Sequence, residues 1–441
     1  MKNLPGILIA LIATSMFYFP VDFAFLPGTN TKNMLAVAGV AALLLSFVIR
    51  REFVISKDII ILLMLSCLVS VITIISVTFN HTPEEAYTTY LISALICLFS
   101  AYAVCSIIRL VHGRIDFPLL INYLCAICVL QCIAALLIRF NPTVQSFVDT
   151  FFTQGQDMLH EMDRLYGIGA SLDVAGTRFA CVLATLPVYL YIDQRKISRL
   201  HIFILAVCFF FVSAIGSIIA RTTMVGTVVG LAYLGIIFFR DIIYGEMSIK
   251  GRFSWTWIVV VIVLIPVGIF LYRQSSDMRH LIRFGFEGFF NLFETGHFRT
   301  SSSDILINKM YVFPEETKTW FIGDGYFGNS RNDINYLGDS TKLGFYMGTD
   351  VGYLRFIFLF GVPGLIAMTL VMVHATITAA NSSPTYKWAY YLALICGLII
   401  WLKVATDVFP FLALGVALGL TDNLIDYDKA VDEVPEKEIE S

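Results

Sequence analysis

Runs of about twenty apolar residues recur along most of this 441-residue chain, and they decide what it can fold into. A helix of that length crosses the apolar core of a bilayer, where only helices and closed barrels satisfy their own backbone hydrogen bonds. Hydrophobic residues make up 58% of the chain and charged residues only 14%, whereas about a quarter of an ordinary soluble domain is charged. The sequence therefore predicts an all-α, polytopic membrane protein.

We expect about twelve membrane-spanning helices in one membrane domain, 1–420. The ninth and tenth are separated by a long polar loop, 273–349, and an acidic tail, 421–441, is expected to be disordered. The first span has no small-residue cleavage site after it, so we expect it to remain as an anchor. The predicted limits of the spans are 5–26, 33–49, 58–79, 87–111, 117–140, 173–192, 200–219, 222–240, 255–272, 351–375, 386–406 and 408–420.

Lysine and arginine gather after every second span, and this bias predicts the orientation of the chain. The short connections on the other side carry far fewer, namely Lys32 and Arg221, and the long loop is exempt from this rule. Both termini are therefore expected in the cytoplasm and the loop 273–349 on the outer side of the membrane. The positive residues after spans two, four, six and eight are Arg50, Arg51, Lys57, Arg109, Arg114, Arg195, Lys196, Arg199, Arg240, Lys250 and Arg252.

All nine cysteines lie in apolar spans, and three of them, Cys125, Cys128 and Cys132, share one helix face. Their span contains no histidine or carboxylate that would complete a metal site, and the seven histidines show no metal-ligand spacing. We interpret the cysteines as small packing side chains and expect no metal site.

Three arginines are candidates for binding an anion. Arg221 stands between two spans with no loop around it, where an arginine is costly unless it is paired or reaches the headgroups. Its planar fork of donors fits a phosphate, and we favour that role over simple snorkelling. Arg178, about one turn inside the sixth span, is open to either interpretation. Arg299 precedes a predicted helix, 301–313, and by itself reads as a solvated loop residue.

Asp350 opens the tenth span, where a carboxylate is stabilised by the helix dipole, so helix capping is one explanation. The other is that Asp350 accepts a hydrogen bond or a proton from a sugar hydroxyl. Arg355 lies five positions further on and is expected to pair with Asp350 only loosely. Tyr326 and Tyr353 are candidates for stacking on sugar rings, although aromatic residues are also ordinary at a membrane interface.

Four pieces in a fixed order carry a resemblance to a known family. They are a serine-containing stretch that ends in an arginine, 217–221; a large loop with Arg299; a Pro-then-Gly turn, 314–325; and the segment 349–354, followed by Phe360-Gly361-Val362-Pro363-Gly364. Over about residues 165–375, their order and topology resemble the O-antigen polymerase and ligase superfamily of bacterial surface-polysaccharide assembly.

The resemblance implies a metal-independent, cofactor-free glycosyltransferase of the bacterial inner membrane that acts on undecaprenyl-diphosphate-linked glycans at the outer side. It implies that Arg178 and Arg221 bind the diphosphate and that Arg299 is a third ligand. From its position in the chain, we also place Asp350 in the active site. Tyr326, Tyr353 and Arg355 would then contact substrate. A chain-length regulator and other polysaccharide-assembly proteins are the expected partners. We do not expect the protein to bind nucleic acid.

Ligases of this superfamily typically carry a His-Asn pair where this chain has Asp350-Val351, which favours a polymerase of repeat units. Transfer of glycan to a lipid or protein acceptor, as in a ligase, remains an alternative. A flippase or exporter of lipid-linked oligosaccharide is a second, although the charged residues within spans cluster at the outer ends, which argues against passage. A non-catalytic assembly scaffold is a third.

Overall fold

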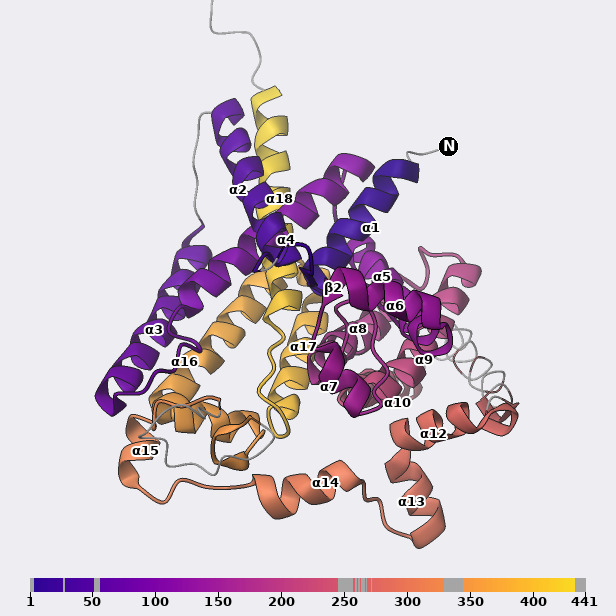
Figure 1. Cartoon of the computed structure of the whole chain (residues 1–441). Helices are drawn as coiled ribbons and strands as arrows, with labels where there is room; N and C mark the ends of the chain where they lie inside the picture. Colours follow the sequence, from indigo (N-terminus) through magenta and orange to yellow (C-terminus); the bar gives the residue numbers. More distant parts are fainter. Residues whose placement is uncertain are drawn as a thin grey trace, which may run out of the picture.

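The structure is a computed structural model, and it describes residues 4–26, 28–50, 56–244, 272–328 and 344–432, with scattered residues between 257 and 270. Helices make up nearly all of the regular structure in these ranges (Figure 1). The described strands are two residues each: β1 (Asp22–Phe23) pairs antiparallel with β2 (Phe152–Thr153). The predicted all-α class is therefore confirmed.

Seven of the described helices are long and apolar enough to cross a membrane. The apolar parts of three more, α1 (Leu4–Tyr18), α2 (Thr31–Arg50) and α18 (Phe409–Asp432), are shorter, and α17 (Lys387–Ile400) is also short, at 14 residues. The chain is a polytopic helical membrane protein. The count of twelve stays a prediction, because the ninth predicted span, 255–272, falls mostly outside the described residues. The seven helices are α3 (Lys57–Asn80), α4 (Tyr90–His112), α5 (Phe117–Phe140), α8 (Leu172–Asp193), α9 (Arg199–Ile219), α10 (Thr223–Ile243) and α16 (Gly352–Ser382).

Five predicted boundaries are wrong. The first span ends at Tyr18 rather than at 26, and residues 22–23 form β1. The tenth span runs on to Ser382 rather than ending at 375. The helix that starts after Thr300 ends at Met310 rather than at 313, because the hydroxyl of Thr349 bonds the carbonyl of Met310. The eleventh span ends at Ile400, and the polar residues of 401–408 leave the helix to bond other segments. Helix α18 runs on to Asp432, since 421–432 contain no proline or glycine to stop it. The tail predicted to be disordered therefore begins as helix, and its remainder, 433–441, lies outside the described residues.

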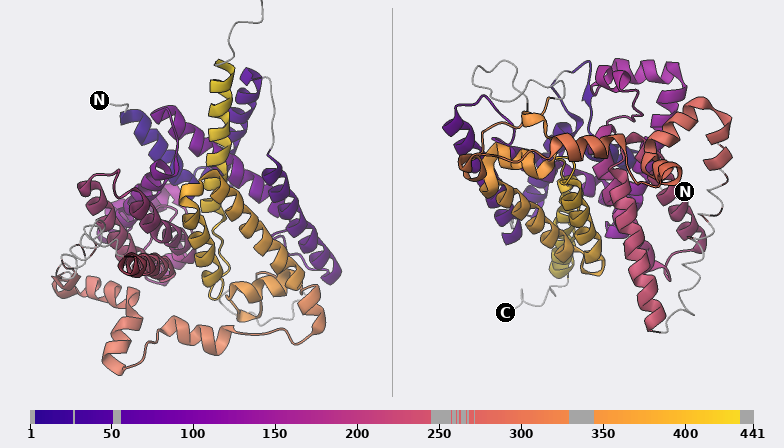
Figure 2. Two further views of the ribbon diagram at one scale, coloured as in Figure 1. Left: turned by 180° about the vertical axis from the view of Figure 1, so that it is seen from behind. Right: turned by 90° about the horizontal axis from the view of Figure 1, so that it is seen from below.

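Helix α8 lies in the core: in its apolar 18-residue stretch, 83% of the residues are buried. It packs between α10 and α17. Helix α4 packs between α2 and α18, and α16 packs between α3 and α18. A band of short helices crosses one end of this bundle (Figures 1 and 2). We call residues 273–328 the polar segment; it contains α12 (Ser276–Gly285), α13 (Glu287–Thr295), α14 (Ser301–Ile305), the π-helix η1 (Leu306–Met310) and α15 (Thr317–Phe321). The remaining short helices are α6 (Pro142–Phe151), α7 (Gln156–Glu161), η2 (Tyr346–Gly348) and η3 (Pro384–Tyr386).

In Figure 1 the polar segment lies at the end of the molecule opposite the start of α1 and the last turns of α18. The start of α1 and the end of α18 therefore lie at one end of the bundle and the polar segment at the other, and which end faces the cytoplasm stays a prediction. Helix α3 connects the two ends: its last residue, Asn80, bonds Gly323 and Lys318 of the polar segment. Lys57, at its start, lies about 36 Å away along a helix of this length.

Cysteine labelling checks which end faces outward. Cysteines replacing Ser276 and Glu315, both exposed in the polar segment, are expected to react with an impermeant maleimide in intact cells. A cysteine replacing the exposed Lys57 should react only after lysis, and the unmodified chain gives the baseline for the nine native thiols. The opposite pattern would invert the topology and place the polar segment in the cytoplasm.

The polar segment is joined to α16 where that helix is broken. Pro363 has no N–H to donate, so the carbonyl of Leu359 lacks its helical partner and accepts from the hydroxyl of Ser76 instead, at 2.7 Å. The carbonyl of Phe358 accepts from the backbone N–H of Asp324, at 2.6 Å. Gly361 takes a positive φ of 70° at the break. The turn at Gly323-Asp324-Gly325 therefore packs against the break in α16 at Gly361-Val362-Pro363-Gly364.

Gly323→Ala is expected to be strongly destabilising, on the order of 3 kcal/mol or more. Gly323 has a φ of +85°, and a Cβ there would lie 2.6 Å from the backbone of Leu359. Gly296 is the matched control, because it has a φ of +77° but open space around it, so Gly296→Ala should cost only about 1 kcal/mol of backbone strain. Thermal unfolding in detergent, followed by tryptophan fluorescence, measures both. Equal shifts would mean that the close approach to α16 contributes nothing.

Candidate functional site: charged residues beneath the polar segment

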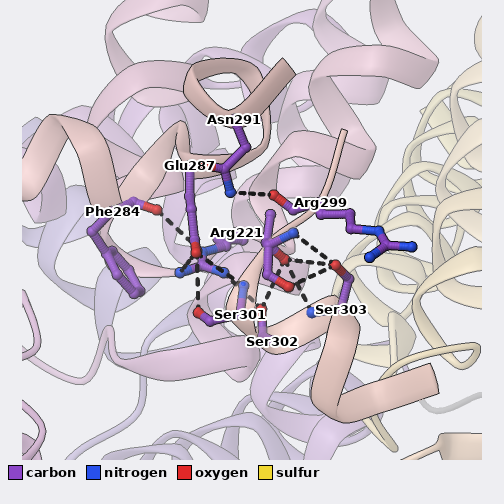
Figure 3. Close-up of polar contacts among 9 residues, drawn as sticks. Arg221, Phe284, Glu287, Asn291, Arg299, Ser301, Ser302 and Ser303 are labelled. Atoms are coloured by element: carbon purple, nitrogen blue, oxygen red, sulfur yellow. Dashed lines mark hydrogen bonds and ion pairs between the residues drawn. The ribbon is translucent and has the colours of Figure 1, made fainter. Parts of the chain in front are cut away.

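Arg221 occupies the junction of α9 and α10, and its whole fork of donors reaches into the polar segment (Figure 3). Its Nε donates to the carbonyl of Phe284 at 3.2 Å and one terminal nitrogen donates to the Ser302 hydroxyl at 2.7 Å. The other lies 2.7 Å from a carboxylate oxygen of Glu287. The side chain is only 15% exposed, so Arg221 does not simply extend into the headgroups. Burial lowers the pKa of Arg221, and the charge of Glu287 opposes that shift.

The carboxylate of Glu287 occupies the place at Arg221 where an external anion would bind. Besides Arg221 it accepts from the backbone N–H of Ser301, at 2.9 Å, and from the Ser301 hydroxyl, at 3.2 Å. A capping box formed by Thr300 and Ser303 fixes the turn that presents Ser301 and Ser302. A guanidinium with hydroxyl and amide donors beside it suits phosphate oxygens as well as carboxylate oxygens.

Arg164 is a second arginine at this place, and the sequence analysis did not select it. Its guanidinium carbon lies over the ring of Phe284 at 4.3 Å from the centroid, the same distance as that of Arg221. Burial and the positive charge of Arg221 lower the pKa of Arg164. Nothing in the local sequence separates it from Arg139, which pairs with Asp163, so only the structure reveals it.

Beside Arg221, a partly exposed ion pair joins α8 to the segment after α17. Asp173 accepts from the ammonium of Lys403, at 2.7 Å, and from the hydroxyl of Thr222. Asp173 does not cap its helix, since the N-cap residue of α8 is Ser171. Lys403 was hidden within a predicted apolar span. It adds a positive charge that acts on both Asp173 and Asp350.

Asp350 does not cap α16 either, because the N-cap residue is Val351 and has no side-chain bond. Asp350 pairs instead with Arg355 at 3.2 Å, more directly than expected, and its side chain is 17% exposed. Burial raises the pKa of Asp350 to about 6, while the charge of Arg355 opposes the shift. Arg355 lies over the rings of Phe327, at 3.7 Å, and Phe345, at 4.7 Å, and its buried Nε has no partner within the described ranges.

The two candidate tyrosines are already engaged inside the protein. Tyr326 is 4% exposed and stacks on Tyr346 with the ring centroids 5.1 Å apart. Tyr353 donates its hydroxyl to the carbonyl of Leu398 and sets its ring edge-on to Trp401. In this conformation neither tyrosine lies open to a sugar ring, so their role as substrate contacts stays a prediction that needs a rearrangement.

Arg178 and Arg299 lie apart from Arg221. Arg178 lies further along α8, with its guanidinium over the ring of Phe19, and the charge of Asp407 acts on it. A hydroxyl bond of 2.7 Å between Thr177 and Thr406 sets these two charged residues beside each other. Burial raises the pKa of Asp407, and the positive charges of Lys32 and Arg178 oppose the shift. Arg299 is exposed, and in Figure 3 its side chain extends away from Arg221.

Within the described ranges, no three His, Cys, Asp or Glu side chains are grouped so that they would hold a metal ion. The fold and this cluster define a polytopic helical membrane protein with charged residues gathered where its helices meet a polar segment. No family model, curated protein or solved structure matches the chain.

Proposed function

We propose that this protein is a membrane glycosyltransferase that polymerises undecaprenyl-diphosphate-linked oligosaccharide repeat units into a surface polysaccharide at the outer side of a bacterial inner membrane. The resemblance noted above motivates the proposal. One observation carries it furthest: Arg221 holds a carboxylate at the base of the polar segment, with hydroxyl and amide donors around it. Such donors also suit a diphosphate.

In the proposed reaction, the acceptor hydroxyl oxygen attacks the anomeric carbon of the donor glycan. The bond from that carbon to the diphosphate oxygen breaks, and undecaprenyl diphosphate leaves with the electron pair. Negative charge therefore grows on the diphosphate, where fixed guanidinium groups in a partly buried site stabilise it. Asp350, with a pKa of about 6, is ionised at neutral pH and can accept the proton of the hydroxyl.

A carrier for the same lipid would need charged groups along a path between the two membrane faces. The charged cluster formed by Arg164, Asp173, Arg221, Glu287 and Lys403 instead gathers between the helices and the polar segment. This placement supports an enzyme acting at one surface.

A deletion strain of the source bacterium tests the proposal through its surface polysaccharide. Loss of a polymerase leaves single repeat units on the lipid that normally carries long chains. Loss of a ligase leaves long chains on undecaprenyl diphosphate, and loss of a flippase leaves repeat units that reagents outside the membrane cannot reach. Either of the last two results would overturn the polymerase. Normal polysaccharide in the deletion strain would overturn all three functions.

A further inference from the structure

Arg164 differs from the arginines around it because, within the described ranges, its guanidinium forms no ion pair. Arg139 pairs with Asp163, Arg283 with Glu294 and Arg221 with Glu287. Arg164 has no hydrogen bond or ion pair from its guanidinium to any described residue. It rests on the Phe284 ring, half-buried, beside a second positive charge. The cluster around it holds three cations, Arg164, Arg221 and Lys403, and two carboxylates, Glu287 and Asp173. One positive charge is therefore uncompensated, and an anion would stabilise it.

The spacing of the two arginines suits an anion with two charged groups. Both guanidinium carbons lie 4.3 Å from the same ring centroid, so they are no farther apart than twice that distance. The carbonyl of Phe284 accepts from Arg221, which holds the ring in place. Two linked phosphates can each meet one guanidinium across this span, and each guanidinium can donate two bonds to one phosphate.

We propose that Arg164 is a second phosphate-binding residue, placed with Arg221 so that each takes one of the two linked phosphates of a lipid diphosphate. The inference rests on the proposed function and adds to it a residue that no sequence motif selects. On binding, Glu287 gives up its place on Arg221 to a phosphate oxygen. Arg164 lines a cavity of about 160 Å³ together with Arg139, His160 and Asp163 among others, and this space leaves its side chain room to turn.

The test measures binding of inorganic pyrophosphate to the full-length protein in phosphatidylcholine nanodiscs, by the shift in melting temperature. Wild-type protein is expected to be stabilised by pyrophosphate. Arg164→Gln should weaken that binding about 10- to 100-fold, and Arg164→Lys, which keeps the charge but not the fork, should fall between the two. Arg283→Gln is the matched control: it removes a paired arginine next to Phe284 in the sequence and should bind as wild type does.

Equal pyrophosphate binding by wild type and Arg164→Gln would overturn the role of Arg164, as would no binding by wild type. Repeating the measurement in nanodiscs with phosphatidylglycerol distinguishes a site for the lipid diphosphate from a site for phospholipid headgroups. If that lipid abolishes pyrophosphate binding, the site takes phospholipid headgroups and the lipid diphosphate is wrong. The deletion strain tests the polymerase independently. Single repeat units in that strain, together with full pyrophosphate binding by Arg164→Gln, would support the polymerase and contradict only the role of Arg164.

Discussion

Arg221→Lys is expected to abolish long polysaccharide while the protein stays in the membrane in normal amounts. Arg221 uses three nitrogens for three separate acceptors, and an ammonium group cannot reproduce that planar arrangement. If Arg221 stabilises charge on the leaving diphosphate, its loss costs on the order of 100- to 1,000-fold in rate. Gel analysis of surface polysaccharide and immunoblotting of membranes measure the two quantities, with Arg221→Ala as the full deletion of the side chain.

The structure offers a second explanation for such a loss, namely that Arg221 only anchors the polar segment through Glu287 and Ser302. Glu287→Gln separates the two explanations. The amide keeps the shape of the side chain but removes the charge that competes with a phosphate. With an anion-binding Arg221, Glu287→Gln should keep its polymer. Loss of polymer from Glu287→Gln as complete as that from Arg221→Lys would make Arg221 an anchor.

Polymerisation is expected to rise with pH and to level off above a midpoint near pH 6. Asp350 has its pKa raised to about 6, and a base must be ionised to accept a proton. Asp350→Asn keeps an acceptor for Arg355 but cannot act as a base, so it should lower the rate on the order of 100-fold or more and flatten the pH profile. Transfer of radiolabelled repeat units in membranes, assayed from pH 5 to pH 8, measures both. A wild-type profile retained in Asp350→Asn would assign the midpoint to another group.

Stability should depend on pH in the opposite sense. Asp350 holds its proton more tightly in the folded chain than in the unfolded chain, where its pKa is near 3.8. Between about pH 4 and pH 6, Asp350 therefore binds more protons in the folded state than in the unfolded state. The contribution of Asp350 to the stability of the fold falls as pH rises through this range and is constant above pH 6. Comparing melting temperatures of wild type and Asp350→Asn across this range isolates the contribution. A difference between the two chains that does not change with pH would contradict the raised pKa.

Much of the fold could be predicted because the bilayer imposes helix length and apolarity. The span predicted at 117–140 is observed as Phe117–Phe140, and the one at 58–79 as Lys57–Asn80. The break in α16 could not be predicted from Pro363 alone. Whether a proline bends a helix or ends it depends on which donor groups bond the carbonyls that lose their helical partners. Here those partners are Ser76 and Asp324, and Ser76 lies 283 residues from the carbonyl it bonds.

The site was only half visible for the same reason. Arg221 and Asp350 stand out because each is a charge at the edge of an apolar run. Their surroundings do not: the Asp173–Lys403 pair joins residues 230 positions apart, and Glu287 and Arg164 look like any charged loop residues. The sequence offers single charges, whereas the function of each depends on which opposite charge the fold sets beside it.

The interruption in α16 also affects how movement passes along this helix. In a continuous helix the ladder of backbone bonds carries a rotation from one end to the other. At Pro363 one backbone bond is missing, and the carbonyls of Leu359 and Phe358, just before the break, are bonded to α3 and to the turn at Asp324. The short piece with Tyr353 and Arg355 is held by Trp401 and Phe327 instead. A force applied at Arg355 would therefore rotate the short piece, 352–360, about Gly361. The rest of α16, 362–382, would stay packed against α3 and α18.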